Sequence, residues 1–144
     1  MGEQSKLIYF QESKTEFILS KYLISTPIRS ERILISKLRL GVLKLEIETG
    51  RKCGLDRNDR KCKICKSDQI ENESHFLFEC EPLNKLREIY LKQLFNKYPT
   101  LSSVSDLDKL MYLYFNENLS SAEMTIATKM LTTLVNARTK LLIS

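Results

Sequence analysis

Apolar residues recur at helical spacing through most of this chain, and turn-forming residues separate the periodic segments. A first helix is predicted over residues 13–25, because one face of that segment would carry Phe17, Ile18, Tyr22 and Leu23. Thr26-Pro27 ends this helix, since the residue before a proline avoids the helical backbone region. The first expectation is therefore a mainly α-helical chain.

Residues 31–49 make a second periodic segment, rich in leucine and isoleucine. The spacing favours a helix over the whole segment, with an apolar face formed by Leu34, Leu38, Val42 and Leu45. Gly41 weakens that helix, and a strand is also indicated by the alternation of Leu43, Leu45 and Ile47. The second half of the segment is therefore ambiguous between helix and strand.

The middle of the chain is predicted to contain the least regular structure. Residues 50–59 form a polar loop, and residues 62–71 have the composition of a turn-rich knuckle. Residues 72–79 can form a short helix that is interrupted near Pro82. Pro82 can in turn occupy the first turn of another helix, which Pro99 closes and whose apolar face carries Leu83, Leu86, Tyr90 and Leu94.

Two further helices are predicted near the C-terminus, each opened by serine. Residues 105–116 form one of them, because Ser105 followed three positions later by Asp108 resembles an N-capping pattern. Ser120 and Ser121 can cap the last helix. The 4-3-4 spacing of that helix predicts an inward face made of Ala127, Leu131, Leu134 and Arg138.

Composition adds that the chain is globular, at 42% hydrophobic and 28% charged residues. No apolar run approaches the roughly 18 residues that a membrane span needs, and residues 1–16 lack the apolar stretch of a secretory signal. We therefore expect an intracellular protein, in the cytoplasm or nucleus, with no membrane partner. In those compartments thiols stay reduced, so clustered cysteines are metal ligands more often than disulfides.

Positive charge is concentrated in one short segment. Residues 51–66 hold seven basic and two acidic residues, which equals the formal net charge of +5 for all 144 residues. The rest of the chain is therefore balanced. Within this segment we predict phosphate contacts from Arg57, Arg60, Lys61, Lys63 and Lys66.

The chain has four cysteines and one histidine, and most of them follow the spacing Cys62-x2-Cys65-x9-His75-x4-Cys80. Two cysteines separated by two residues can direct both sulfurs at one metal ion while backbone amides point at them. Three thiolates and an imidazole suit one Zn²⁺ ion, and four protein ligands make the site structural rather than catalytic. His75 and Cys80 lie about 140° apart on an ideal helix, so the helix between them should tighten or end before Cys80.

An alternative without metal remains open at this point. The three cysteines would then be small buried hydrophobic residues, and His75 a satisfied surface histidine. The leftover Cys53 could replace a ligand, but it lies nine residues before Cys62 and is expected in the basic loop as a free thiol.

The simplest organisation is one zinc-binding helical domain over residues 1–144. It would be a small helical bundle organised around one CCHC zinc site, since no internal repeat, low-complexity tract or linker is visible. The helical N-terminal flank would span residues 13–49, the zinc segment about residues 60–87, and the C-terminal helices residues 105–143.

The central residues also carry a family resemblance. Glu73-Ser74-His75-Phe76-Leu77-Phe78-Glu79-Cys80 has the form E-x-H-x-L-x-x-C, follows a Cys-x2-Cys knuckle and an acidic stretch, and precedes Leu86-Arg87. Together with residues 38–41, 44–51 and 60–65, these motifs resemble the zinc-binding segment at the C-terminal end of non-LTR retrotransposon reverse transcriptases. The resemblance is specific over the central 50 residues or so and looser in the flanks.

The resemblance implies a zinc ion held by Cys62, Cys65, His75 and Cys80, and contact with RNA or DNA during reverse transcription. The chain departs from the family in having Cys53 where a non-cysteine residue is usual, and in lacking the reverse transcriptase itself, including any Tyr-x-Asp-Asp motif. A C-terminal fragment of such an element, or a stand-alone derivative, is the expectation. A reverse transcriptase or another protein is a further expected partner.

Two functions from different classes follow. The first is a non-catalytic, zinc-stabilised module that binds nucleic acid; the second is a structural or protein-interaction module in which zinc only holds the fold. An enzyme is not expected, because no glycine-rich phosphate loop is present and the zinc site would occupy the histidine that a Cys-His pair needs.

The acidic pairs Asp106/Asp108 and Glu71/Glu73 are interpreted as solubilising or capping residues. Phe76 and Phe78 are interpreted as either core or base-stacking side chains.

Overall fold

The computed structural model of the chain describes residues 22–23 and 26–143. Tyr22 and Leu23 are helical, and the rest of the helix predicted over residues 13–25 lies outside the described residues. The chain is extended from Thr26 to Ile28, as the threonine-proline pair predicts.

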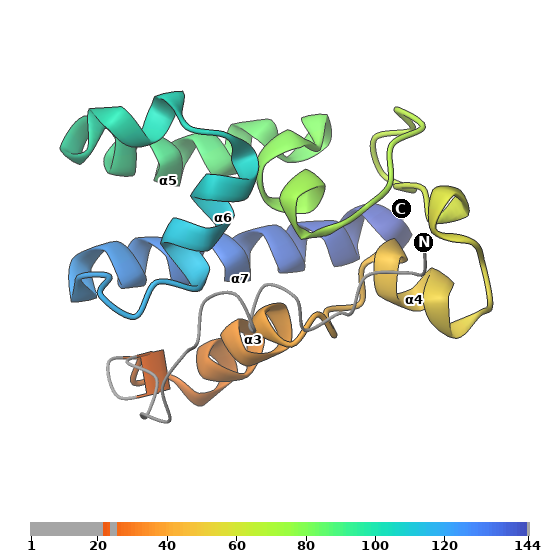
Figure 1. The fold of residues 1–144 in the computed structure, drawn as a ribbon, viewed down its shortest axis with the longest axis horizontal. Coiled ribbons are helices and arrows are strands. Elements are labelled where there is room, and N and C mark those ends of the chain that lie inside the picture. Colours follow the sequence, from red (N-terminus) through yellow and green to blue (C-terminus); the bar gives the residue numbers. More distant parts are fainter. Residues whose placement is uncertain (1–21, 24–25, 144) are drawn as a thin grey trace.

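The long C-terminal helix α7 (Ser121–Ile143) is the centre of the fold. It contacts α3 (Arg29–Arg39), α5 (Asn84–Lys97) and α6 (Asp106–Tyr114), and Figure 1 shows α5 and α3 on opposite sides of it. The predicted inward face is confirmed, because the buried residues of α7 include Ala127, Leu131, Leu134 and Arg138. Burial of the apolar residues of this face against three helices stabilises α7 through the hydrophobic effect.

Side-chain caps fix the starts of α6 and α7, as predicted. The Ser105 hydroxyl accepts a hydrogen bond from the Asp108 backbone N–H at 3.1 Å. The Ser120 hydroxyl accepts from the Glu123 N–H at 3.2 Å and donates to the Glu123 carboxylate at 2.9 Å. Such caps satisfy backbone donors that have no partner inside the helix, each contributing about 1 kcal/mol.

The single helix predicted over residues 31–49 is wrong, and so is the strand considered for its second half. Helix α3 ends at Arg39, and a separate helix α4 (Glu46–Lys52) follows. Gly41 causes the break: it has φ +68, and its N–H and that of Val42 bond back to the Leu38 and Lys37 carbonyls at 3.1 and 2.9 Å. This is the usual hydrogen-bond pattern of a glycine-terminated helix. Helix α4 also extends into the predicted polar loop, which begins only after Lys52.

Helix α5 begins and ends close to its two prolines. Pro82 lies in a short 3₁₀ turn, η3 (Glu81–Leu83), that runs directly into α5, and Pro99 opens another, η4 (Pro99–Ser103), just after α5 ends. The predicted apolar face is confirmed, because Leu83 and Leu94 are buried and Leu86 and Tyr90 pack against the core.

A buried arginine joins α3 to the end of α6. The Arg39 side chain donates to the Tyr114 carbonyl at 2.6 Å and to the Glu117 carboxylate at 2.9 Å. Its guanidinium carbon lies 4.6 Å from the centroid of the Tyr22 ring, a cation–π distance.

The predicted fold class is confirmed over the described residues, which are mainly helical and contain no strand. The only extended pairing among them is an isolated antiparallel bridge between Lys61 and Ile70. None of the described helices is long and apolar enough to cross a membrane. The Lys61–Ile70 bridge lies in the predicted zinc segment, which packs near the C-terminal end of α7 (Figure 1).

Candidate metal centre

The knuckle that carries Cys62 and Cys65 is closed by backbone hydrogen bonds. The Cys62 N–H donates to the Gln69 carbonyl at 2.8 Å, and the Glu71 N–H donates to the Arg60 carbonyl at 3.1 Å. Between these two hydrogen-bonded segments of the loop, Lys66 and Asp68 adopt positive φ values of +53 and +64. The loop therefore reverses direction immediately after Cys65, which returns the chain toward the segment that holds His75.

His75 and Cys80 lie at the two ends of a widened helical turn, η2 (His75–Glu79), which is a π-helix. Asn72 caps its start by accepting a hydrogen bond from the His75 N–H at 2.8 Å, and the Cys80 N–H donates to the His75 carbonyl at 2.8 Å. The predicted end before Cys80 is confirmed, whereas the predicted tightening is wrong. A bond between residues five apart widens the turn, which brings side chains five positions apart toward the same face.

The four predicted ligands converge on one point. Their ligand atoms all lie within 4.8 Å of one another; the Cys62 and Cys80 sulfurs are 3.9 Å apart, and the Cys65 sulfur lies 3.4 Å from His75 Nε2. With metal–sulfur and metal–nitrogen bonds of about 2.3 and 2.0 Å, a tetrahedral zinc site has sulfur–sulfur and sulfur–nitrogen edges of about 3.8 and 3.5 Å. The arrangement therefore fits one tetrahedral ion, and the alternative of a surface histidine is wrong because His75 is buried.

The environment of His75 orients its ring for metal binding. With Nε2 facing the cysteines, Nδ1 lies 2.9 Å from the Gln69 side-chain oxygen and 3.6 Å from the Glu79 carboxylate. An acceptor on Nδ1 places the proton there and leaves Nε2 free to coordinate. Burial lowers the pKa of the His75 imidazole, and the charge of Arg87 acts in the same direction, so the neutral ligand form is favoured.

The three thiols differ in their surroundings. Burial raises the pKa of Cys62 and Cys80, and neighbouring sulfurs raise the pKa of Cys80 further. Burial also acts on Cys65, but hydrogen bonds with Ser67, Cys62 and Cys80 together outweigh it, so the pKa of Cys65 is lowered. Metal binding has to release the proton of each cysteine that coordinates as a thiolate.

Arg87 fixes the helical turn that carries His75. Its buried guanidinium donates to the carbonyls of Leu77 and Phe76 at 2.9 and 3.2 Å, and also to the Asn84 side chain. Carbonyls at the end of a helix have no partner inside it, so Arg87 satisfies groups that would otherwise be buried unpaired. Phe76 and Leu77 are fully buried and Phe78 packs against the core, which confirms the core interpretation of the two phenylalanines.

A buried ion pair joins the knuckle to α7. Arg138 donates to both carboxylate oxygens of Glu71 at 2.8 and 2.7 Å, and Glu71 has no exposed surface. The same carboxylate accepts the Glu46 N–H at 2.8 Å, so Glu71 caps α4, and it lies 3.9 Å from the Cys62 sulfur. The capping interpretation is thus confirmed for Glu71, whereas the solubilising interpretation is wrong for both Glu71 and Glu73, which are buried.

Four of the five predicted phosphate-contact residues reach the surface in or near the knuckle, with Arg57 in the 3₁₀ turn η1 (Arg57–Asp59) that precedes it. Arg57 and Lys66 are exposed. Lys63 is exposed and lies 3.4 Å from the Glu46 carboxylate, and half-buried Lys61 donates to the Asp68 carbonyl at 3.0 Å. These side chains remain candidates for binding an anionic partner.

The prediction for Arg60 is wrong. Its side chain is buried and donates to the Leu55 carbonyl at 2.8 Å and to the Ile47 carbonyl at 3.4 Å. It packs against Gly50, where an added β-carbon would lie 2.6 Å from Arg60 Cγ. Arg60 therefore holds the knuckle against α4 and is not available to a phosphate.

Cys53 stands apart from the metal-ligand group. It is exposed at the C-terminal end of α4, it forms no disulfide, and it is not one of the residues that converge on the site. The structure thus separates the free thiol from the four ligands, as the spacing predicted.

Comparison of the chain with protein-family models, with curated proteins and with solved structures finds no match. The structure nevertheless gives each letter of the E-x-H-x-L-x-x-C motif a place in the site. His75 and Cys80 belong to the group that could hold a metal ion, and Leu77 and Glu73 are buried.

Proposed function

We propose that the Cys62, Cys65, His75 and Cys80 group binds one Zn²⁺ ion with a structural role. The donor set supports zinc, because three soft thiolates and one imidazole in tetrahedral positions suit an ion with no geometric preference of its own. Four protein ligands complete the coordination shell, which leaves no position for a catalytic water. The ion would link the knuckle to the turn that carries His75 and Cys80.

The module that zinc holds together binds nucleic acid through phosphates. The observation that carries this proposal is the display of Arg57, Lys61, Lys63 and Lys66 within residues 51–66, a segment whose excess positive charge equals the formal net charge of the whole chain. Lys61 and Asp68 form a surface ion pair, which contributes little and can be exchanged for a phosphate. The exposed Lys63 lies 3.4 Å from the carboxylate of buried Glu46. A preformed surface also loses less conformational entropy on binding than a flexible tail.

Resemblance to the zinc-binding segment of non-LTR retrotransposon reverse transcriptases supports the same proposal. The proposed partner is therefore RNA or DNA bound with little sequence preference, as a non-catalytic accessory to reverse transcription. Arg87, the arginine of the Leu86-Arg87 motif, adds to this support because it clamps the turn between two ligands. Because Arg87 has a defined structural role, the Leu86-Arg87 part of the family resemblance is less easily explained by chance.

A protein-interaction module is the second candidate function. It is favoured by the apolar end of α7, where Leu141, Leu142 and Ile143 are 43%, 40% and 81% exposed. Clusters of exposed apolar side chains mark protein interfaces more often than isolated ones do. In this function zinc would only stabilise the fold, and the knuckle cations would keep the domain soluble.

A salt titration of oligonucleotide binding separates the two functions. The wild-type chain is compared with a knuckle variant, Lys61→Ser/Lys63→Ser/Lys66→Ser, and with a control of equal charge change, Lys85→Gln/Lys92→Gln/Lys129→Gln, whose lysines are exposed on α5 and α7. Each phosphate contact to a single strand contributes about 0.7 to the slope of log K against log salt, so the knuckle variant should flatten that slope by about two units. The control should not change it. Binding that is undetectable at low salt, or equal slopes in the knuckle variant and wild type, would favour the interaction module.

A further inference from the structure

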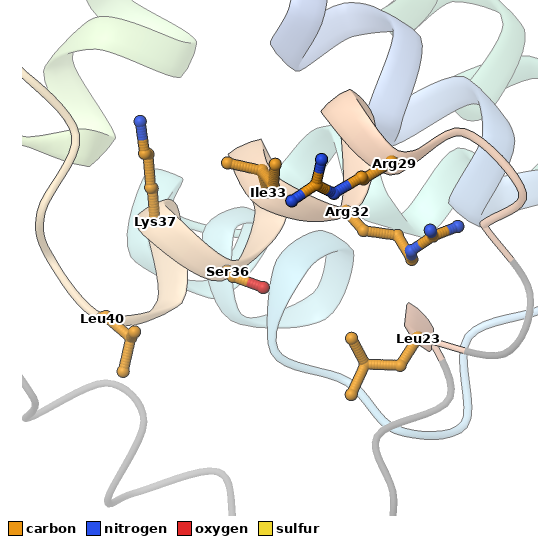
Figure 2. A pocket seen from close by; sticks show the side chains of 7 residues that line it. All are labelled: Leu23, Arg29, Arg32, Ile33, Ser36, Lys37 and Leu40. Atoms are coloured by element: carbon orange, nitrogen blue, oxygen red, sulfur yellow. The ribbon is translucent and has the colours of Figure 1, made fainter.

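A hollow of about 340 Å³ lies along the outer side of α3. Figure 2 shows its apolar residues Leu23, Ile33 and Leu40 together with Arg29, Arg32 and Lys37 from the same helix. The hollow is at the small end of the volumes that ligand sites occupy, and its residues include no acid. Its chemistry is therefore an apolar floor with a cationic rim.

Helical spacing explains why the cations gather on this side. Arg29, Ile33 and Lys37 are four residues apart and so share one face of α3, whereas Ile35 and Leu38 are buried on the other. Arg32 is held in place by donating to the Thr26 and Pro27 carbonyls at 2.7 and 2.8 Å. The apolar residues of this face, Ile33 and Leu40, are 41% and 42% exposed, so the described helices leave it open.

A second hollow, of about 220 Å³, continues the first. Lys37 lines both, and the second hollow adds Lys44 beside the apolar residues Leu34, Leu43 and Val135. It ends at Arg138, whose side chain lies 3.8 Å from the Glu46 carboxylate, and Lys63 of the knuckle lies 3.4 Å from the same carboxylate. The two hollows therefore share Lys37, and the second lies one carboxylate away from Lys63 of the proposed nucleic-acid surface.

The track defined by Arg29, Lys37 and Lys44 is unneutralised within the described part of the chain. These three side chains form no ion pair with a described residue. Arg138, in contrast, is paired with Glu71, so it lines the second hollow without adding free charge. Like charges along one surface attract an anionic partner that spans them.

We propose that single-stranded nucleic acid bound at the knuckle continues along α3, with phosphates at Arg29, Lys37 and Lys44 and unpaired bases over the two hollows. This inference rests on the proposed nucleic-acid binding. Charge complementarity and the apolar floors favour a single strand, because only unstacked bases can present an apolar face between phosphates. Arg29 and Lys37 are separated by about 12 Å of helix, a distance that only a strand of more than one nucleotide can span.

The test uses the full zinc-loaded chain and labelled oligo(dT) strands of about 4 and about 16 nucleotides, the range that single-strand-binding grooves cover. The track variant is Arg29→Gln/Lys37→Gln/Lys44→Gln, and the lysine control on α5 and α7 serves again. The track variant should weaken binding of the long strand by about tenfold or more and flatten its salt slope by about two units, with the short strand unaffected. A second variant, Ile33→Ser, should weaken the long strand without changing the salt slope, which identifies contact with bases. Zinc content and melting temperature confirm that each variant is folded.

The outcomes distinguish this inference from the function on which it rests. If neither strand binds the wild-type chain at low salt, both fail. If the long strand binds and the knuckle variant weakens it, but the track variant behaves like the control, the function stands and the track is refuted. If the track variant loses duplex binding as much as it loses binding of the long single strand, the track binds duplex as well, and the proposal for a single strand is overturned.

Discussion

The buried pair Glu71–Arg138 gives the sharpest prediction about what holds the knuckle to the bundle. In Arg138→Met the methionine keeps most of the buried stem but removes the guanidinium, and leaves a Glu71 carboxylate with no exposed surface unpaired. Removing one partner of a buried ion pair costs about 3–5 kcal/mol, a large part of a domain's total stability. For a chain of this length that corresponds to a fall of about 6–20 °C in melting temperature.

The loss should also reach the metal. Glu71 lies 3.9 Å from the Cys62 sulfur, so without Arg138 its charge opposes the thiolate that zinc requires. Changes in groups that support metal ligands lower metal affinity by about 10–100-fold. We therefore expect Arg138→Met to weaken zinc binding by this amount, measured by competition with a chromophoric chelator.

A paired substitution separates lost charge balance from lost packing. In Glu71→Gln/Arg138→Met the side-chain amide oxygen introduced at position 71 can still accept the Glu46 N–H, and neither substituted side chain carries a charge. The double variant should therefore be more stable than Arg138→Met in urea unfolding, whereas Lys129→Met, an exposed change on α7, should match wild type within about 0.5 kcal/mol. If Arg138→Met lies within about 1 kcal/mol of wild type, or the double variant is no more stable than the single one, the pair does not act as described.

Two further predictions concern the same region. Chelation of the metal should increase hydrogen exchange in residues 60–87 while α7 and the helices packed on it stay protected, because Leu131 and Leu134 are buried independently of the site. Uniform exchange across the chain would contradict this prediction. Gly50→Ala should lower stability in urea by about 1–3 kcal/mol, because the new β-carbon would lie 2.6 Å from Arg60 Cγ, and an unchanged urea midpoint would show that Arg60 shifts freely.

Sequence reasoning predicted the parts of this fold that depend on local pattern. The face of α7, the serine caps of α6 and α7 and the proline boundaries of α5 follow from spacing and backbone preference alone. The convergence of the four candidate ligands was predicted for a similar reason, since their spacing is a property of one short segment. The break at Gly41 was within reach too, because a glycine after a leucine-rich helix is the usual C-terminal signal.

Residues whose roles depend on tertiary contacts were missed. Arg60 and Glu71 are charged residues in polar segments, and only contact with α4 and α7 reveals that both are buried. One signal was available: Arg138 lies on the apolar face of the last helix, where a charge requires a buried partner. The widened turn at His75 was not predicted, because a bond between residues five apart leaves no mark in the sequence.

The central claim, a single structural zinc ion on four named ligands, is tested most directly by the metal content of purified protein. We predict one zinc per chain in the wild type and in Cys53→Ser, and loss of zinc in Cys80→Ser. Cobalt in place of zinc should give the visible absorption of a tetrahedral thiolate site. Full zinc occupancy in Cys80→Ser, or loss of zinc in Cys53→Ser, would contradict the assignment of the fourth ligand and with it the proposed zinc site.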